Sequence, residues 1–233
     1  GVRGLLSEVI LIGIMFVVIA FVVLLTQGTR KIPVSYAKRV VGRKVYGGQS
    51  THIPLKVNTA GVMPIIFAQS IMFIPSTIAT FFSDNDFMQG VIRWFSFDHP
   101  FYWFIFGIMI VFFTYFYTAI AFDPTQVSQQ MKQHGGFIPG IRPGKKTAEY
   151  IDNILSRVTL PGSFALALVA IFPYILMQAM DVSYDLASFF GGTSLLIIVG
   201  VALDTLQQIE SHLMSRHYDG FLTKGKIRGR RRM

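Results

Sequence analysis

The sequence predicts an all-α integral membrane protein with five transmembrane helices and a cytoplasmic β-hairpin loop. Composition is the first reason, because 52% of the 233 residues are hydrophobic and only 14% are charged, whereas soluble domains are about one-quarter charged. The second reason is that the apolar residues gather in five long runs, at residues 5–26, 59–82, 100–122, 158–180 and 186–205. A helix needs about 20 such residues to cross the roughly 30 Å of hydrocarbon in a bilayer.

The distribution of basic residues is the third reason, and it also predicts the orientation. Of the 21 Lys and Arg residues, all but Arg3 and Arg93 lie in segments 27–58 and 123–157 and in the tail 206–233. The connections at the other end of the spans are acidic and carry Asp84, Asp86, Asp98, Asp181 and Asp185. Cytoplasmic loops of membrane proteins hold the excess of Lys and Arg, so the three basic segments are predicted to be cytoplasmic.

Other classes of protein fit the sequence poorly. A transmembrane β-barrel would need alternating segments of about 10 residues, which are absent. The chain has no Cys, so it has neither a disulfide framework nor a Cys-ligated metal site. Five spans with a cytoplasmic C-terminus put the N-terminus outside, yet the chain opens "GVRGLLSEV" with no initiator Met and no export signal. We therefore expect it to be the second part of a longer membrane protein.

The segment after the first span, 27–58, has the pattern of a β-hairpin. The runs "VSYAKRVV" and "KVYGGQSTHI" are β-prone and flank "VGRK", where Gly42 supplies a positive φ and the tip carries Arg43 and Lys44. Two interpretations stay open: a solvated loop that obeys the charge rule, or a rigid finger that docks an anionic partner such as RNA or an acidic protein surface.

The second span, 59–82, is rich in Pro and polar residues. Asn58 stands at its mouth, and Pro64, Gln69 and Pro75 lie within it. Because Pro removes a helix hydrogen bond, this segment is either a bent structural helix or a moving helix beside an aqueous path. The third span, 100–122, is aromatic, and Trp103 at its outer end is typical of the interfacial belt.

The second basic segment, 123–157, predicts a shaped loop. An Asp-Pro turn opens a short amphipathic helix that ends at Gly135 and Gly136, and "GFIPGIRPGKKT" then forces tight turns that expose Arg142. A helix resumes at "KTAEYIDNILSR" and leads into the fourth span, 158–180. The fifth span follows Gly191 and Gly192 and is predicted to close at Asp204, with the end of the tail mobile or resting on an anionic membrane surface.

No catalytic chemistry is predicted, and neither a metal nor a cofactor. The five His residues form no HExxH motif, and no Walker A, GxGxxG or GxSxG motif has the required context. None of the five runs carries a carboxylate pair or a central Lys or Arg, which argues against ion-coupled transport.

Three long motifs resemble a known family. The stretches "YAKRVVGRKVYGGQSTHIPLKVNTAGVMPIIFAQSI", "GFIPGIRPGKKTAEYID" and "FFGGTSLLIIV" are similar to the SecY protein-conducting channel of bacteria. The resemblance covers essentially the whole chain and implies the C-terminal half of a SecY-type channel, spans six to ten of ten.

The resemblance implies roles for particular residues. A pore ring would include Ile66 and Ile197. One side of the lateral gate would include Asn58, Pro64, Gln69 and Ile74. The cations that dock the SecA motor ATPase or the ribosome would be Arg39, Arg43, Lys44, Arg142, Lys145 and Lys146. The implied partners are the N-terminal half of the same channel, SecE, SecG, SecA, the ribosome, signal sequences, nascent polypeptides and the lipid of the bacterial inner membrane.

Two other functions remain as alternatives. A small-solute transporter with a broken helix around Pro64 would need a coupling residue at the midplane, and the sequence offers none. A scaffold that recruits ribosomes to the membrane, without conducting any chain, would share the basic loops.

Overall fold

The computed structural model describes residues 5–36, 39–41, 44–46, 50–82, 86–96, 99–180, 187 and 192–224. Five of its helices are long and apolar enough to cross a membrane. They are α1 (Leu5–Gln27), α2 (Met63–Phe81), α4 (Pro100–Ala121), α6 (Lys145–Met180) and α8 (Gly192–Lys224). The predicted fold class, five membrane helices with a β-hairpin loop, is confirmed.

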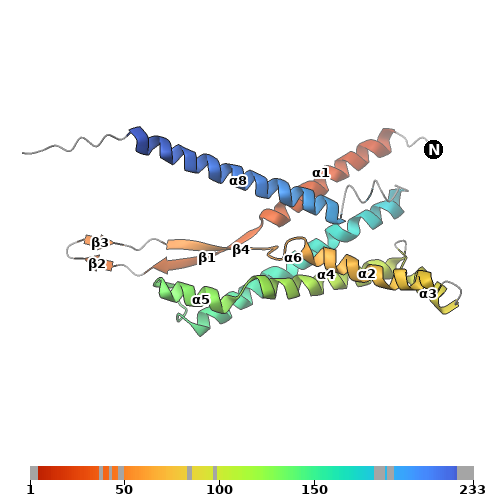
Figure 1. Cartoon of the computed structure of the whole chain (residues 1–233), viewed down its shortest axis with the longest axis horizontal. Helices are drawn as coiled ribbons and strands as arrows, with labels where there is room; N and C mark the ends of the chain where they lie inside the picture. The colour runs from red at the N-terminus through yellow and green to blue at the C-terminus, as the bar shows by residue number, and fades with distance from the viewer. Residues whose placement is uncertain are drawn as a thin grey trace, which may run out of the picture.

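The helices are arranged around α6. α4 packs along α6, α2 packs on α4, and α8 crosses α1 while both also contact α6 (Figure 1). Half of the apolar stretch of α6 is buried, against 22% to 28% for the other four helices. The shared core therefore lies along α6 and includes Leu166, Val169 and Ala170 from that helix, with Ile65 from α2 and Ile110 from α4.

The hairpin is longer than the sequence predicted. β1 (Thr29–Tyr36) pairs antiparallel with β4 (Ser50–Lys56), and Ile32 lies opposite Ile53. Beyond them, β2 (Arg39–Val41) pairs with β3 (Lys44–Tyr46), so the ladder extends away from the helices (Figure 1). On its other edge β1 pairs with the short β5 (Gly136–Phe137), which gives the strand order β4-β1-β5.

A second, smaller core lies beneath this sheet. It combines Ile32, Val34 and Leu55 of the sheet with Met131 of α5 (Pro124–Gln133), Ile138 of the loop and Ile151 of α6. The alternation of buried and exposed residues along β1 explains why these side chains share one face. These elements belong to the two basic segments that are predicted to be cytoplasmic, so we call the sheet, α5, the loop 134–144 and the first turns of α6 the cytoplasmic platform.

Two helices extend beyond the apolar runs that the sequence predicted as spans. The carboxylate of Asp204 ends the apolar run, as predicted, but α8 continues to Lys224 through good helix formers such as Leu206, Gln207 and Gln208. α6 runs as one helix from Lys145 to Met180, so the helix predicted in the second loop leads directly into the fourth span. The end of the tail, residues 225–233, lies outside the described residues, as does Gly191.

Two features of the outer side and of the helix starts complete the fold. The acidic connection after α2 contains a short amphipathic helix, α3 (Asp86–Trp94), which the sequence analysis did not predict. α4 begins with His99 as its N-cap and Pro100 in its first turn, and α5 repeats this pattern with Asp123 and Pro124. Such caps satisfy the free N–H groups at a helix start.

Candidate functional site

The backbone of the loop that carries Arg142 is held by hydrogen bonds from two buried hydroxyl groups. Ser128 of α5 donates a hydrogen bond to the carbonyl oxygen of Gly144 at 2.7 Å. Thr147 of α6 donates one to the carbonyl oxygen of Arg142 itself at 3.0 Å. Both side chains are at most 2% exposed, so these bonds are sheltered from competing water. The backbone of the loop is therefore held at both ends of its tip.

The tight turns predicted for this loop are present. Gly140 and Gly144 have φ angles of 84° and 106°, a conformation that favours glycine. Between them, the amide of Ile141 donates to the carbonyl oxygen of Ile138 at 3.1 Å, and Ile138 is buried in the platform core. Arg142 is exposed on this rigid support, as expected from the sequence.

The other predicted docking cations divide into two groups. Lys145 and Lys146 are exposed on the first turn of α6, and Lys146 lies 3.3 Å from Glu149. Arg39 is in β2 and Lys44 is in β3, where Lys44 pairs with Val41 in the ladder. Arg43 lies outside the described residues. β2 and β3 lie farther out along the hairpin than α5 (Figure 1), so the predicted cations occupy two separate places.

An acidic group caps the platform near the membrane. Asp123, just beyond α4, accepts hydrogen bonds from the hydroxyl and the amide of Thr125 and from the amide of Gln126. These bonds lower the pKa of Asp123 below its ordinary value, and the bond from the Thr125 hydroxyl makes the largest contribution. The carboxylate therefore stays charged at the start of α5, where it fits the helix dipole.

The foot of α2 is clamped by two glycines. The amide of Val57 donates to the carbonyl oxygen of Gly28 at 2.8 Å. A Cβ atom at Gly162 of α6 would lie 2.7 Å from the carbonyl oxygen of Val57, and one at Gly28 would lie 3.2 Å from its Cγ2. Real Cβ atoms do not approach backbone so closely, and therefore only glycine fits at Gly162. Val57 is thus wedged between the end of α1 and the middle of α6.

Asn58 follows this clamp directly and has an unusual environment. Its side-chain oxygen is buried and has no hydrogen-bond partner among the described residues. A buried polar group without a partner costs about 1–3 kcal/mol, so most such groups find one. Between Asn58 and the start of α2, Gly61 has a φ of 66°, and a Cβ atom at this position would meet nothing within 4 Å. The connection from Asn58 to α2 is therefore a free turn.

One face of α2 packs on α4, and the adjoining face is left open. Pro64, Ile65, Ala68, Met72 and Ala79 are buried. Ile66 is 40% exposed and Ile74 is 53% exposed, and Gln69 is half-buried. The predicted gate residues therefore lie on both the buried and the open side of one helix.

The two prolines of α2 differ in their effect. Pro64 lies in the first turn, where its missing N–H has no partner to lose, so it does not break the helix as the transporter alternative required. Pro75 lies inside the helix. There Ser76 and Thr77 both donate to the carbonyl oxygen of Phe73, at 2.9 and 2.8 Å. The carbonyl oxygen that loses its helical N–H donor to Pro75 is that of Ile71, four residues earlier.

Ile197 lies on α8 and is 43% exposed. α8 packs mainly on α1 and α6, whereas α2 packs mainly on α4 and α3. The structure thus leaves both predicted ring residues, Ile66 and Ile197, uncovered on different helices. No group of three or more His, Cys, Asp or Glu that could hold a metal occurs among the described residues.

Sequence reasoning missed three elements of this region. These are the hydroxyl groups of Ser128 and Thr147, the clamp of Gly28 and Gly162 on Val57, and the orphan oxygen of Asn58. The bond of Ser128 and the clamp depend on contacts between distant segments, whereas the bond of Thr147 to Arg142 depends on the path of the loop and the orphan oxygen on its burial. Only glycine within an apolar span, as at Gly162, gave a signal that could have suggested a close approach.

The comparisons with known proteins decide the family. The family model described as SecY matches residues 2–206. The chain belongs to the SecY family. It is 46% identical over 231 residues to the protein translocase subunit SecY of Thermotoga maritima. The aligned region covers 99% of this chain and 52% of that protein. It is 48% identical to the Thermus thermophilus protein of the same name, over 93% of this chain and 49% of the relative.

The chain spans about half the length of these curated relatives, in agreement with the expectation that it corresponds to the C-terminal half of a SecY channel. A solved structure from work on the plug domain of the SecY protein has the same fold, with a TM-score of 0.51 over 86% of this chain and 49% of that one, at 14% identity. SecY proteins are subunits of a translocation channel and not enzymes. The chain is thus a multi-pass membrane protein of a channel family.

Proposed function

We propose that this chain forms half of the pore and one side of the lateral gate of a protein translocation channel, for secretion of preproteins and insertion of membrane proteins. The observation that carries the proposal is at the foot of α2, where a buried oxygen of Asn58 has no partner in the part of the chain that the structure describes, beside an open helix face. A polar group left unsatisfied by these residues requires a donor from elsewhere. The N-terminal half of the same channel would supply that donor across the closed gate.

The clamp at Val57 supports a mechanism for opening. The backbone at Val57 is fixed between Gly28 and Gly162, whereas the turn at Gly61 is unobstructed. α2 would therefore pivot on a fixed foot instead of sliding, and the interior Pro75 would let its outer part bend. Gln69 and Ile74 would then face signal sequences that leave the channel for lipid.

The proposed pore-ring role of Ile66 and Ile197 rests on the family resemblance, and their exposure, at 40% and 43%, leaves both side chains available to a ring that the other half completes. Bulky apolar side chains around a constriction exclude water and ions, yet they yield to a polypeptide. The remainder of the ring would come from the other half of the channel.

The cytoplasmic platform would dock the SecA motor or the ribosome. A rigid loop that exposes Arg142, with Lys145 and Lys146 beside it, supports recognition of an anionic surface such as ribosomal RNA or acidic side chains. Arg39, Arg43 and Lys44 would form a second contact farther along the hairpin. The distribution of Lys and Arg supports a cytoplasmic position for both contacts, with the chain in the bacterial inner membrane.

SecE and SecG are proposed as further membrane partners of the assembled channel. The low burial of α1 and α8, 22% of each apolar stretch, leaves surface for the other half and for these subunits.

Cross-linking of a translocating chain tests the function directly. This chain has no Cys, so one Cys in place of Ile66 reports a single site within it, in the complete channel with a stalled nascent preprotein. We expect a disulfide with a Cys in the preprotein, and none from Cys at Ile120, which is 65% exposed on another helix. A failure to cross-link from Ile66 and from Ile197 alike would favour a ribosome-recruiting scaffold.

A further inference from the structure

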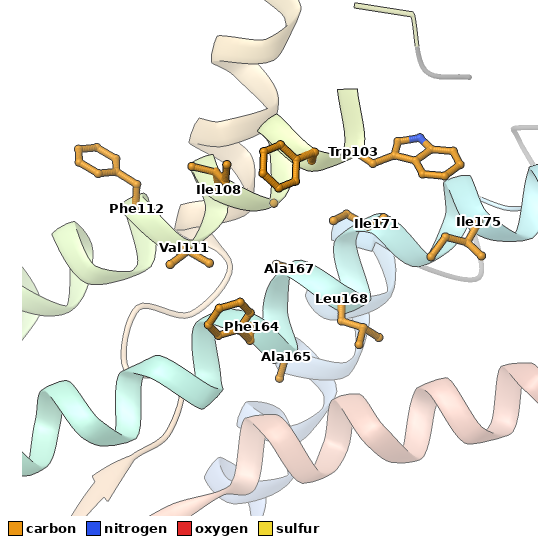
Figure 2. Close-up of a pocket in the computed structure, with 12 residues that line it drawn as sticks. Trp103, Ile108, Val111, Phe112, Phe164, Ala165, Ala167, Leu168, Ile171 and Ile175 are labelled. Carbon is orange, nitrogen blue, oxygen red and sulfur yellow. The ribbon is translucent and has the colours of Figure 1, made fainter. Parts of the chain in front are cut away.

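A groove of about 710 Å³ runs between α4 and α6, away from the proposed gate helix α2. Figure 2 shows its apolar lining, to which α4 contributes Ile108, Val111 and Phe112 and α6 contributes Phe164, Leu168 and Ile175. Gly107 keeps it open, since a Cβ there would already lie 3.2 Å from Cδ1 of Ile171. No role in translocation or docking uses this groove.

One end of the groove is polar, and a hydrogen bond marks its place. The hydroxyl of Tyr115 on α4 donates to the carbonyl oxygen of Ser156 on α6 at 3.4 Å. Tyr115 follows Val111 by four residues and therefore lies on the same, groove-lining face of α4. The two helices are thus joined just below the groove, on the side of the cytoplasmic platform.

Arg157 lies at this joined end. It is the neighbour of Ser156 and precedes Phe164 by seven residues, which is close to two helical turns and about 10 Å along the same face of α6. Its side chain is exposed, and no ion pair of Arg157 occurs within the part of the chain that the structure describes. Asp152, five residues earlier, points to another side of the helix. The groove therefore has an unpaired cation at its cytoplasmic end.

Trp103 lines the groove at the other end. Tryptophan at the outer end of a membrane helix is typical of the interface. From Trp103 to Arg157 the surface thus changes from interfacial aromatic to apolar to basic.

We propose that this groove binds an anionic phospholipid of the cytoplasmic leaflet, with one acyl chain along the apolar lining and the phosphate held by Arg157. In a bilayer no hydrophobic driving force brings α4 and α6 together to close the groove, because lipid tails are as apolar as the side chains that line it. Packing of an acyl chain does not distinguish one headgroup from another. Arg157 would supply the preference for an anionic lipid, since a basic side chain near the membrane surface attracts an anionic headgroup. The proposal does not depend on the gate or on docking.

Brominated lipids provide the test in the complete channel. The native Trp residues of the channel, including Trp94 and Trp103 of this chain, are first replaced by Phe, because Trp103 itself lines the groove. A Trp then replaces Val111 inside the groove, and its fluorescence is measured in nanodiscs that contain brominated phosphatidylglycerol or brominated phosphatidylcholine. A matched channel carries Trp in place of Ile120, which lies nine residues further and hence on the opposite side of α4. Each Trp reporter is also measured in a channel that carries Arg157→Gln. A second channel carries Arg93→Gln, which removes the same charge at the outer end and serves as the control.

We expect stronger quenching of the groove Trp by the anionic lipid, with about a fivefold preference over the zwitterionic one. Arg157→Gln should remove the preference and keep the quenching, whereas Arg93→Gln should change neither, and Trp at Ile120 should show no preference. Equal quenching by both lipids with Arg157 intact would overturn the headgroup site. A groove Trp that neither lipid quenches would show that a polypeptide covers the groove, and would also overturn the proposal.

Discussion

The cytoplasmic platform and the gate helix α2 differ in how far this chain completes them. In the platform, the sheet has its own core, and the hydroxyl groups of Ser128 and Thr147 satisfy carbonyl oxygens of the exposed loop. At α2, one face is open and the oxygen of Asn58 has no partner among the described residues. The difference indicates that the proposed docking surface is completed within this chain, whereas the proposed gate needs a second half.

The largest effect is expected at the clamp that joins the two regions. Gly162→Val places side-chain atoms against the carbonyl oxygen of Val57, which lies 2.7 Å from the position of a Cβ. Overpacking of this kind costs about 1–3 kcal/mol, so the melting temperature of the purified channel should fall. Gly200→Ala, where nothing lies within 4 Å, is the control and should be neutral. Equal melting of the two variants would remove the clamp from the account.

The platform should lose docking strength when its internal bond is removed. Ser128→Ala leaves the carbonyl oxygen of Gly144 without its buried donor, at a cost of about 1–3 kcal/mol. Amide hydrogen exchange over residues 138–146 should rise, and affinity for the motor or ribosome should fall by about fivefold to about 140-fold if all of this cost appears in binding. Ser128→Thr retains a hydroxyl and should restore affinity, whereas Ser211→Ala, which removes an exposed bond on α8, should have no effect. Faster exchange without weaker docking would separate the loop from partner binding.

The gate should respond to Asn58 without a loss of folding. Asn58→Leu removes the orphan oxygen and the bond proposed across the closed gate, and interhelical bonds of this kind are worth about 0.6–2 kcal/mol. Export of preproteins with defective signal sequences should change, while the melting temperature and motor affinity stay the same. Thr59→Val, next along the chain, removes only a local bond to the carbonyl of Lys56 and is the control. Unchanged stringency of signal-sequence selection for Asn58→Leu would count against the polar gate.

The smallest effect is a pH dependence of the platform. Hydrogen bonds from Thr125 lower the pKa of Asp123 below its ordinary 3.8 in the folded state, so the ionised carboxylate favours the folded cap. This contribution is complete above the unfolded pKa and is lost as pH falls through the lower folded pKa. Hydrogen exchange at the amides of Thr125 and Gln126, corrected for intrinsic rates, should be constant from pH 7 to 5 and rise in stronger acid. In Asp123→Asn this acid-dependent rise should vanish, and its persistence would point to another group.

The sequence predicted the local features of both regions well. The Gly and Pro spacing of "GFIPGIRPGKKT" was sufficient to predict an exposed Arg142, because turn geometry depends on neighbouring residues. The five apolar runs predicted the membrane helices, because the length and composition of one continuous segment decide whether it can cross a bilayer. Asp204 marked the end of the apolar run but gave no information on the end of α8, since a charge marks the edge of an apolar layer and not the end of a helix.

Long-range contacts could not be predicted. The contact of Gly162 with Val57 joins residues that are far apart in the chain, and no periodicity reports it. The same holds for Ser128, whose partner Gly144 lies across the platform loop. The position of Pro64 in the first turn of α2 depended on where the helix begins, and helix ends are the least certain feature of a sequence-based prediction.

Spin-label distances in the complete channel test the central difference most directly. One pair, at Ile74 of α2 and Leu160 of α6, reports movement of the proposed gate helix against the rest of this chain. A second pair, at Lys132 of α5 and Asp152 of α6, lies within the platform, and all four side chains are exposed. On addition of a stalled preprotein, the first distance should change while the second stays constant. A fixed first distance, or an equal change in both, would contradict a self-contained platform beside a moving gate helix.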